Sequence, residues 1–431
     1  MNKALSHRIA ALAVAIACLV SCDLCELGRP VRDRERILFN CSPVSVTVRA
    51  GSSFVSNSLL TGLVADSSFF VYAWDTGGAP DGFLTSAPGA PDFINGLKVE
   101  FADNDSQGGN NSYDAADLTN SMDQYWPQDR TDYAYSFFAY YPYNAVPARN
   151  GISAPVFSGF PVGTPDGTDA QFSFTAKTDA TGNPAVDDMI DFCVSDIAND
   201  QQYGHTTSTY DGTVDLRFRH MLTMVRVKFV KSQDVPANKS VTIVEAKLDD
   251  INTTGKLNLS YTPPAEPGVN IAGSTHFEWS HVGDPESYEI TINGRNPNYN
   301  PETPAVPPVN PVNLGYDQAD DDCDVFLMIP QHIWPYGNSH PQKIHFWWKA
   351  EGSDTIHECD DLYLAESKAT IGSETPSGID DWAINRMVTY TVVIKTTGME
   401  FGTDSYLDLN VEIAPWPGAE EDINGYYSII N

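Results

Sequence analysis

The segment MVRVKFV, residues 224–230, decides the fold class, because apolar and basic side chains alternate along it. Val225, Val227 and Phe229 occupy every second position, and Arg226 lies between two of them. A repeat of two residues is that of a β-strand with one face on a hydrophobic core, whereas an amphipathic helix repeats every 3.6 residues. The segment therefore predicts a half-buried β-strand.

Similar short runs, rich in β-branched and aromatic residues, recur along the chain with Gly, Pro, Asn and Asp between them. They cover residues 37–39, 44–48, 68–74, 97–101, 135–141, 214–218, 241–248, 288–292, 325–329, 343–348, 387–394 and 407–413. Helical patterns are scarce, and only residues 114–122 predict a short helix. Many short strands separated by turn residues are typical of sandwich proteins. We therefore predict an all-β fold.

The length of 431 residues accommodates two or three domains of ~150 residues each. Residues 199–212 are polar and lack an apolar period, which makes them the candidate boundary between two domains. We predict a signal peptide at residues 1–21, a flexible tether at 22–36, an N-terminal β-sandwich domain at 37–200 and a C-terminal one at 201–431, with a possible donor-strand tail.

The N-terminus has the layout of a secretory signal. Lys3 and Arg8 lie in a short basic head, and residues 9–20 are almost wholly apolar, too short a run for a transmembrane helix of ~20 residues. The run ends in LVSC, residues 19–22, which resembles the lipobox of bacterial lipoproteins. We predict cleavage before Cys22 and lipidation of its thiol by acyl chains such as palmitate. An ordinary signal peptide with an incidental cysteine is the alternative.

Charge and cysteine content restrict the partners. The formal net charge of -32 repels phosphate backbones, so we predict no nucleic-acid partner. The chain has seven cysteines, but no Cys-x-x-Cys pair in its folded part gives support for a structural zinc site. Cys323 and Cys359 are candidates for a bridge between neighbouring strands, and either can equally be a free thiol.

No motif points to catalysis or to a cofactor. The nine histidines are scattered, and His220 has the pattern of a core or strand-end histidine more than that of a ligand. The acidic residues Asp320, Asp322 and Asp324 have the hard oxygen ligands that suit Ca²⁺. They lack the spacing of an EF-hand loop, and a solvated acidic loop is the preferred interpretation. We predict no enzyme activity, no cofactor and no metal.

Several segments, in order, carry a resemblance to a known family. They are residues 125–127 with 135–143, 188–195, 216–229 (which contains Phe-x-His before the alternating strand), 326–331, and 390–394 with 411–416. They resemble the bacterial fimbrillin family, the subunits of type V pili and their surface-lipoprotein relatives. The resemblance implies two β-sandwich domains of transthyretin-like topology. It also implies a structural and adhesive role at the cell outer membrane and in the fimbrium.

The resemblance further implies a maturation step and an assembly step. A trypsin-like protease removes the first strand by cleaving after an Arg, for which Arg49 fits best and Arg36 is second. A strand from the C-terminal segment of the next subunit then fills the vacated groove, giving a head-to-tail polymer. The candidate donor residues alternate along the tail: Leu407, Leu409, Val411 and Ile413. Residues 426–430 are also apolar enough to dock.

Two alternatives stay open from the sequence. Residues 407–413 also fit an ordinary final strand of the chain's own sheet. The whole chain also fits a monomeric surface lipoprotein of the same fold that binds a glycan or a host protein.

Overall fold

The computed structural model describes residues 37–41, 48–50, 53–55, 69–75, 91–102, 112–115, 125–127, 133–141, 156–157, 170–176, 191–203, 212–235, 237–238, 241–262, 274–290, 312–317, 325–350, 356–369, 379–395, 407–415 and 427–430. Their regular elements are β-strands and one 3-10 helix, η4 (Leu364–Glu366). The all-β prediction is confirmed. The short helix expected over residues 114–122 is wrong at its start, where Ser112–Ala115 forms strand β6.

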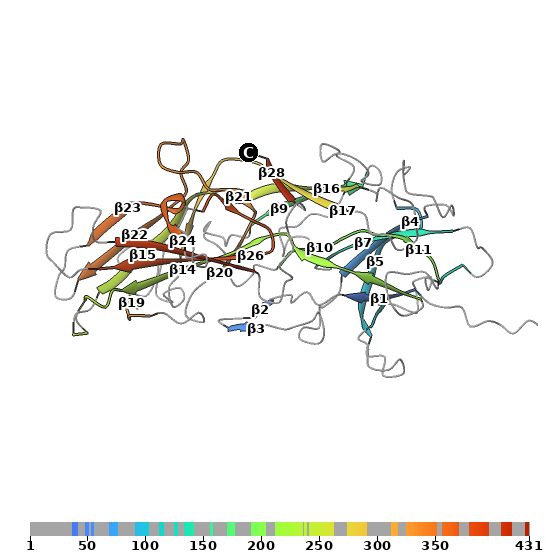
Figure 1. Cartoon of the computed structure of the whole chain (residues 1–431), viewed down its shortest axis with the longest axis horizontal. Coiled ribbons are helices and arrows are strands. Elements are labelled where there is room, and N and C mark those ends of the chain that lie inside the picture. The colour runs from blue at the N-terminus through green and yellow to red at the C-terminus, as the bar shows by residue number, and fades with distance from the viewer. Residues whose placement is uncertain are drawn as a thin grey trace, which may run out of the picture.

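Nine strands form one large sheet at one end of the elongated molecule (Figure 1). Its order is β12 (Thr213–Leu216), β1 (Leu38–Cys41), β6, β5 (Ile94–Ala102), β4 (Phe69–Asp75), β7 (Tyr135–Tyr141), β10 (Cys193–Ser195) and β13 (Phe218–His220), and β11 (Ala198–Gln201) pairs with β7. Only Arg217 separates the two outermost strands, β12 and β13, in the sequence. The chain therefore passes from one end of the sheet's strand order to the other within one residue, which requires the sheet to be strongly curled.

The curled sheet encloses the first of two hydrophobic cores. Phe39, Val71, Phe137, Val214 and Phe218, from five different strands, all belong to this inner core.

Strand β7 is buried along its whole length because both faces of the sheet are covered. Phe137 and Ala139 face the inner core, and Phe138 and Tyr140 belong to the second core cluster. A second sheet supplies the cover. Its order is β28 (Tyr427–Ile430), β17 (Ser274–His281), β16 (Thr254–Thr262), β9 (Ala170–Thr175) and β8 (Val156–Phe157). The rings of Tyr140 and Phe172 meet edge to face, 5.1 Å apart.

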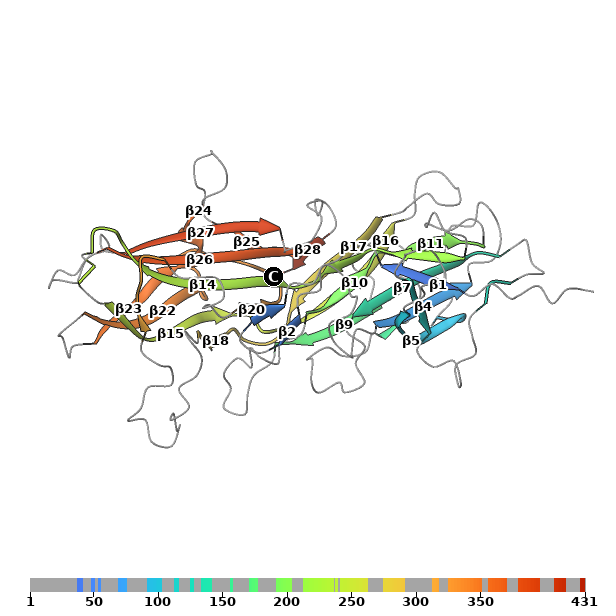
Figure 2. The ribbon, with the colours of Figure 1, turned by 90° about the horizontal axis from the view of Figure 1, so that it is seen from below.

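Two further five-stranded sheets form a sandwich at the other end of the molecule (Figure 2). The first has the order β20 (Val325–Met328), β14 (Thr223–Lys231), β26 (Arg386–Ile394), β27 (Leu407–Pro415) and β24 (Lys368–Ala369). The second has the order β18 (Glu286–Glu289), β15 (Val241–Ile251), β22 (Lys343–Ala350) and β23 (His357–Tyr363), with β19 (Val312–Asn313) paired to β15. Two small pairs, β2 (Val48–Ala50) with β3 (Ser53–Val55) and β21 (Gln331–His332) with β25 (Asp381–Trp382), complete the described strands.

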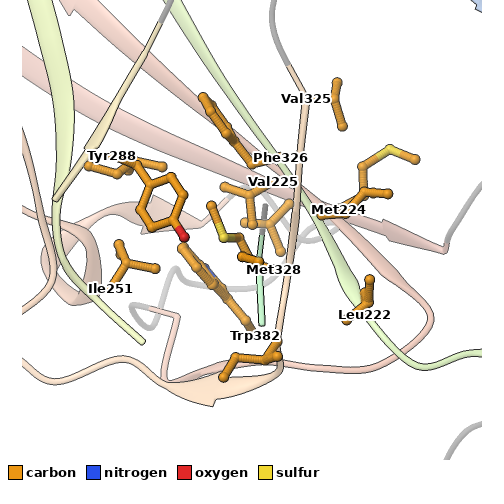
Figure 3. Close-up of a cluster of buried hydrophobic side chains, with 14 of the residues drawn as sticks. Leu222, Met224, Val225, Ile251, Tyr288, Val325, Phe326, Met328 and Trp382 are labelled. Carbon is orange, nitrogen blue, oxygen red and sulfur yellow. The ribbon is translucent and has the colours of Figure 1, made fainter. Parts of the chain in front are cut away.

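The segment that decided the fold class is the centre of this sandwich. Strand β14 runs parallel to β26 over nine paired residues and antiparallel to β20. Phe229 reaches across to Phe346 of the facing sheet, with ring centroids 5.4 Å apart. Met224 and Val225 join a buried group that includes Trp382 (Figure 3). The predicted strand is confirmed.

The polar side of β14 is more buried than the sequence pattern predicted. Arg226, expected to face solvent, is only 6% exposed. Strand β14 has neighbours on both sides, so the alternation marks the direction of its side chains but not their access to water.

The predicted domain boundary, between residues 200 and 201, falls inside β11 and not between two sheets. Strands β12 and β13 complete the curled sheet, although they follow residue 200. The hairpin of β16 and β17 also returns to this end, where β16 pairs with β9 along Thr254–Asn258. Part of the polar boundary segment is itself a strand, since Asn199, Asp200 and Gln201 belong to β11 and are buried.

Candidate assembly site

Strand β1 is held between two partners in the curled sheet. It pairs in parallel with β12, from Leu38 opposite Thr213 to Cys41 opposite Leu216, and in antiparallel with β6 at Phe39. The amide of Leu38 also donates to the Gly212 carbonyl at 3.0 Å. This short strand therefore closes the seam between the last strand of the sheet and β6.

Side chains of the β1 segment fill the inner core at that seam. Ile37 and Phe39 are 2% and 1% exposed. The Phe39 ring contacts Phe137 edge to face, with centroids 5.8 Å apart. The Trp126 indole donates to the Gly212 carbonyl at 3.0 Å, beside the start of β12. Without β1, the chain would have an apolar slot between β12 and β6, lined by aromatic rings and unpaired backbone groups.

The preferred cleavage residue, Arg49, lies near the start of the described chain. Arg49 is the middle residue of β2 and pairs with Phe54 of β3, so the backbone at that position belongs to a short hairpin. Arg36, the second candidate, and Cys22, the predicted lipidation site, lie outside the described residues.

The predicted donor residues lie in β27, inside the chain's own sheet. Strand β27 pairs with β26 along its whole length and with β24 on its other side, where Ala369 lies opposite Val411. Leu409 and Val411 are 6% and 1% exposed, and Leu407 and Ile413 pack against the same core. In the monomer these residues therefore form an internal strand, which is the alternative that the sequence left open.

The last described segment, β28, lies at the edge of the second sheet. It pairs in parallel with β17, from Tyr427 opposite Phe277 to Ile430 opposite Ser280. Phe277 and Trp279 of β17 are buried. Among the described strands, β17 is the only partner of β28, which is therefore held by one row of backbone hydrogen bonds.

A separate group of polar side chains is buried where the chain leaves the curled sheet. Asp191, Cys193 and His220 are all 0% exposed, and Cys193 lies opposite His220 in the pairing of β10 with β13. His220 Nδ1 lies 2.5 Å from Asp191 Oδ2. The Cys193 thiol donates to the same carboxylate oxygen at 3.4 Å and lies 3.5 Å from His220 Nδ1. His220 is thus a core histidine at a strand end, as its pattern predicted.

Electrostatics keep the thiol in this group protonated. Burial raises the pKa of Cys193 well above its ordinary value, and the charge and hydrogen bond of Asp191 raise it further. Strand pairing brings the three side chains together from two separate motifs, residues 188–195 and 216–229. The spacing of these residues in the sequence does not predict the group, because spacing alone does not reveal which strands pair.

Asp200 is a second buried acid, near the opposite end of β7, where β11 pairs with Tyr135 and Phe137. It is 3% exposed, adopts φ 57 in the left-handed region, and burial raises its pKa to about 6. Its Oδ1 atom has no hydrogen-bond partner among the described residues. Asp200 lies where the register of β11 against β7 shifts, between Ala198 and Gln201, which indicates a bulge at this position.

The other predicted site residues can be placed only in part. Asp320, Asp322, Asp324 and Cys323 lie outside the described residues, and Cys359 is buried in β23. Within the described part of the chain, no helix combines the length and the apolarity that a membrane crossing requires.

Comparison with known proteins identifies the family. The sequence model of the fimbrillin-like family matches residues 62–416. A fimbrial protein from Bacteroides vulgatus ATCC 8482 has a similar fold, with a TM-score of 0.52 at 15% identity over 88% of this chain and 99% of that one. The tip fimbrial protein Mfa3 from Porphyromonas gingivalis, with a C-terminal truncation, gives a TM-score of 0.32 at 10% identity over 81% and 94% of the two chains, too distant to bear on the fold.

A search of curated protein sequences found no match. The family match spans most of the chain and agrees with the segments that suggested the resemblance, so this chain is a member of the fimbrillin-like family.

Proposed function

We propose that this protein is a structural and adhesive fimbrial subunit of the cell surface, exported as a lipoprotein through Cys22 and matured by cleavage after Arg49. In this scheme a trypsin-like protease releases the lipid together with β1, and the freed subunit polymerises head to tail by strand exchange. The fimbrillin-like family supports the role of fimbrial subunit.

The observation that carries the proposal is the position of β1. The strand is short, it lies at the start of the described chain, and it inserts between β12 and β6 with Ile37 and Phe39 in the core. A cut after Arg49 would separate it from the body of the chain. An incoming strand could then restore both rows of hydrogen bonds and fill the pockets of these two side chains.

Two observations support β28, and not β27 alone, as the part of the tail that moves. Strand β27 has partners on both sides, so its removal would open the sheet that it forms with β26 and β24. Strand β28 has one described partner and supplies Tyr427, Ile429 and Ile430 in four residues. The predicted donor set of Leu407, Leu409, Val411 and Ile413 and this terminal strand can be separated by experiment.

An Arg-specific protease tests the scheme on the purified full chain. We expect a cut after Arg49, loss of the N-terminal fragment, and ladders that resist dissociation on denaturing gels. Arg49→Ala should abolish the ladders, and Arg36→Ala, the matched control, should retain them. Cleaved chains that remain monomeric with β1 still bound would contradict the proposal and favour a monomeric surface lipoprotein.

Truncation after Gly425 tests the donor. If β28 is the donor strand, this variant is still cleaved after Arg49 but forms no ladder. Ladders that persist in the truncated chain would assign the donor role to the β27 residues instead.

A further inference from the structure

The group formed by Asp191, Cys193 and His220 has the chemistry of a metal site. It combines a carboxylate, a thiol and an imidazole, and their nearest ligand atoms all lie within 4.8 Å of one another. Each of the three side chains is fully buried, so bulk water has no access to their polar atoms. Asp191 Oδ1 is buried and has no hydrogen-bond partner among the described residues.

We propose that these three residues bind a structural zinc ion. In a tetrahedral zinc site with Zn–S near 2.3 Å and Zn–N near 2.0 Å, the sulfur and nitrogen ligands are about 3.5 Å apart. Cys193 Sγ lies 3.5 Å from His220 Nδ1 and 3.4 Å from Asp191 Oδ2. Two of the three edges of the site therefore already have the required length.

The third edge is short because the imidazole and the carboxylate share a hydrogen bond. His220 Nδ1 and Asp191 Oδ2 are 2.5 Å apart, about 0.8 Å less than two zinc ligands require. Zinc binding would replace the shared proton and part the two side chains by that distance. Both oxygens of Asp191, the thiolate and the imidazole would then supply four donor atoms from three residues. Because all three side chains are fully buried, no substrate can reach the ion, and its role would be structural.

Charge and ligand softness select the ion. One carboxylate, one thiolate and a neutral imidazole balance the charge of a divalent cation, so the loaded site is neutral in a region where an unpaired charge is costly. The thiolate disfavours Mg²⁺ and Ca²⁺, which prefer oxygen ligands, and suits Zn²⁺. The ion also overcomes the high pKa of the thiol, since coordination deprotonates it.

The site lies at a junction of the fold. His220 is the last residue of β13. Strand β14, which belongs to the sandwich at the other end of the molecule, begins at Thr223. The Met221 amide donates to the Phe192 carbonyl at 2.8 Å, which fixes the turn between them. Zinc at this position would bind β10 to β13 and hold the exit of the chain from the curled sheet. This role is independent of the assembly scheme proposed above.

Cobalt binding to the uncleaved full chain tests the site, after dialysis against a chelator. We expect one Co²⁺ per chain, with thiolate-to-cobalt absorption in the near ultraviolet, and displacement by one equivalent of Zn²⁺. Cys193→Ser should abolish the absorption and weaken binding more than about 100-fold, the upper range for loss of even an outer-shell partner. Cys359→Ser removes another buried thiol and should leave the absorption unchanged.

Thermal unfolding gives a second readout that does not depend on the spectrum. Zinc should raise the unfolding midpoint of the native chain and of Cys359→Ser, because it binds the folded state. If Cys193→Ser fails to fold, His220→Gln serves as the second ligand variant. The number of Co²⁺ ions bound per native chain then still tests the proposal. A native chain without thiolate absorption, or absorption that Cys193→Ser retains, overturns the proposal.

Discussion

The rings of Phe39 and Phe137 pack edge to face, with centroids 5.8 Å apart and an interplanar angle of 71°. This contact joins a strand at the start of the described chain to β7, which is four strands away from β1 in the order of the curled sheet. The proposed maturation would remove this contact, so its energy contributes to how strongly β1 is held.

Phe39→Ala should lower the free energy of unfolding by about 3–5 kcal/mol, because it leaves a cavity in the inner core. Leu38→Ala is the matched control on the other face of β1, where the side chain is half-buried, and should cost roughly 1–2 kcal/mol. Urea denaturation of the uncleaved chain measures both. An equal loss in the two variants would show that the inner face of β1 does not anchor the strand.

Asp200→Asn should stabilise the chain near neutral pH. The folded state raises the pKa of this carboxyl from 3.8 to about 6, so it prefers the protonated form. The contribution of Asp200 is therefore fully present below the unfolded pKa and is lost as the pH rises through about 6. Asparagine mimics the protonated acid and tolerates φ 57.

Denaturation at two pH values checks this prediction. A shift of this size corresponds to roughly 2–3 kcal/mol near pH 7, and the difference between Asp200→Asn and the native chain should vanish near pH 4. A constant difference across this range would mean that the carboxyl does not titrate between its folded and unfolded pKa values.

Asp191→Ala should cost about 1–3 kcal/mol in the presence of a chelator, because it removes the buried hydrogen bond between Asp191 and His220. The control is Asp381→Ala. Its pair with His332 has a similar distance of 2.7 Å, but the two side chains are 48% and 29% exposed. That variant should lose no more than about 1 kcal/mol. Thermal and urea unfolding should show the larger loss in Asp191→Ala, and the reverse order would contradict a stabilising role of the buried Asp191–His220 hydrogen bond.

Tyr390→Phe should lower the free energy of unfolding by about 1–3 kcal/mol. The Trp382 indole donates to the Tyr390 hydroxyl at 2.9 Å, and both residues are 0% exposed, so the variant leaves a buried donor unpaired. Burial also raises the pKa of Tyr390. Tyr336→Phe, at a residue that is 70% exposed, should change stability by less than about 0.5 kcal/mol. Equal effects would exclude a structural role for the Trp382 hydrogen bond.

The sequence predicted local structure well where a strand lies half-buried in a sheet. The alternation through Val225, Val227 and Phe229 became β14, and the aromatic run at residues 135–141 became β7. These predictions succeeded because side chains of a strand point alternately to its two faces, whatever the partner strand is. The helix expected from residue 114 failed because Tyr113 and Asp114 pair with β5 in the curled sheet, and such tertiary pairing overrides a weak local preference.

The sequence by itself determined the fold class, the strands of the core and the family of this protein. Only the tertiary structure decided which strands pair, residues 38–41 with 213–216 and residues 171–175 with 254–258, and that Asp191 contacts His220. Backbone hydrogen bonds are the same for every strand, so a local pattern does not identify its partner. The slot filled by β1 and the buried ligand group both arise from such long-range pairing, and neither is visible until the chain has folded.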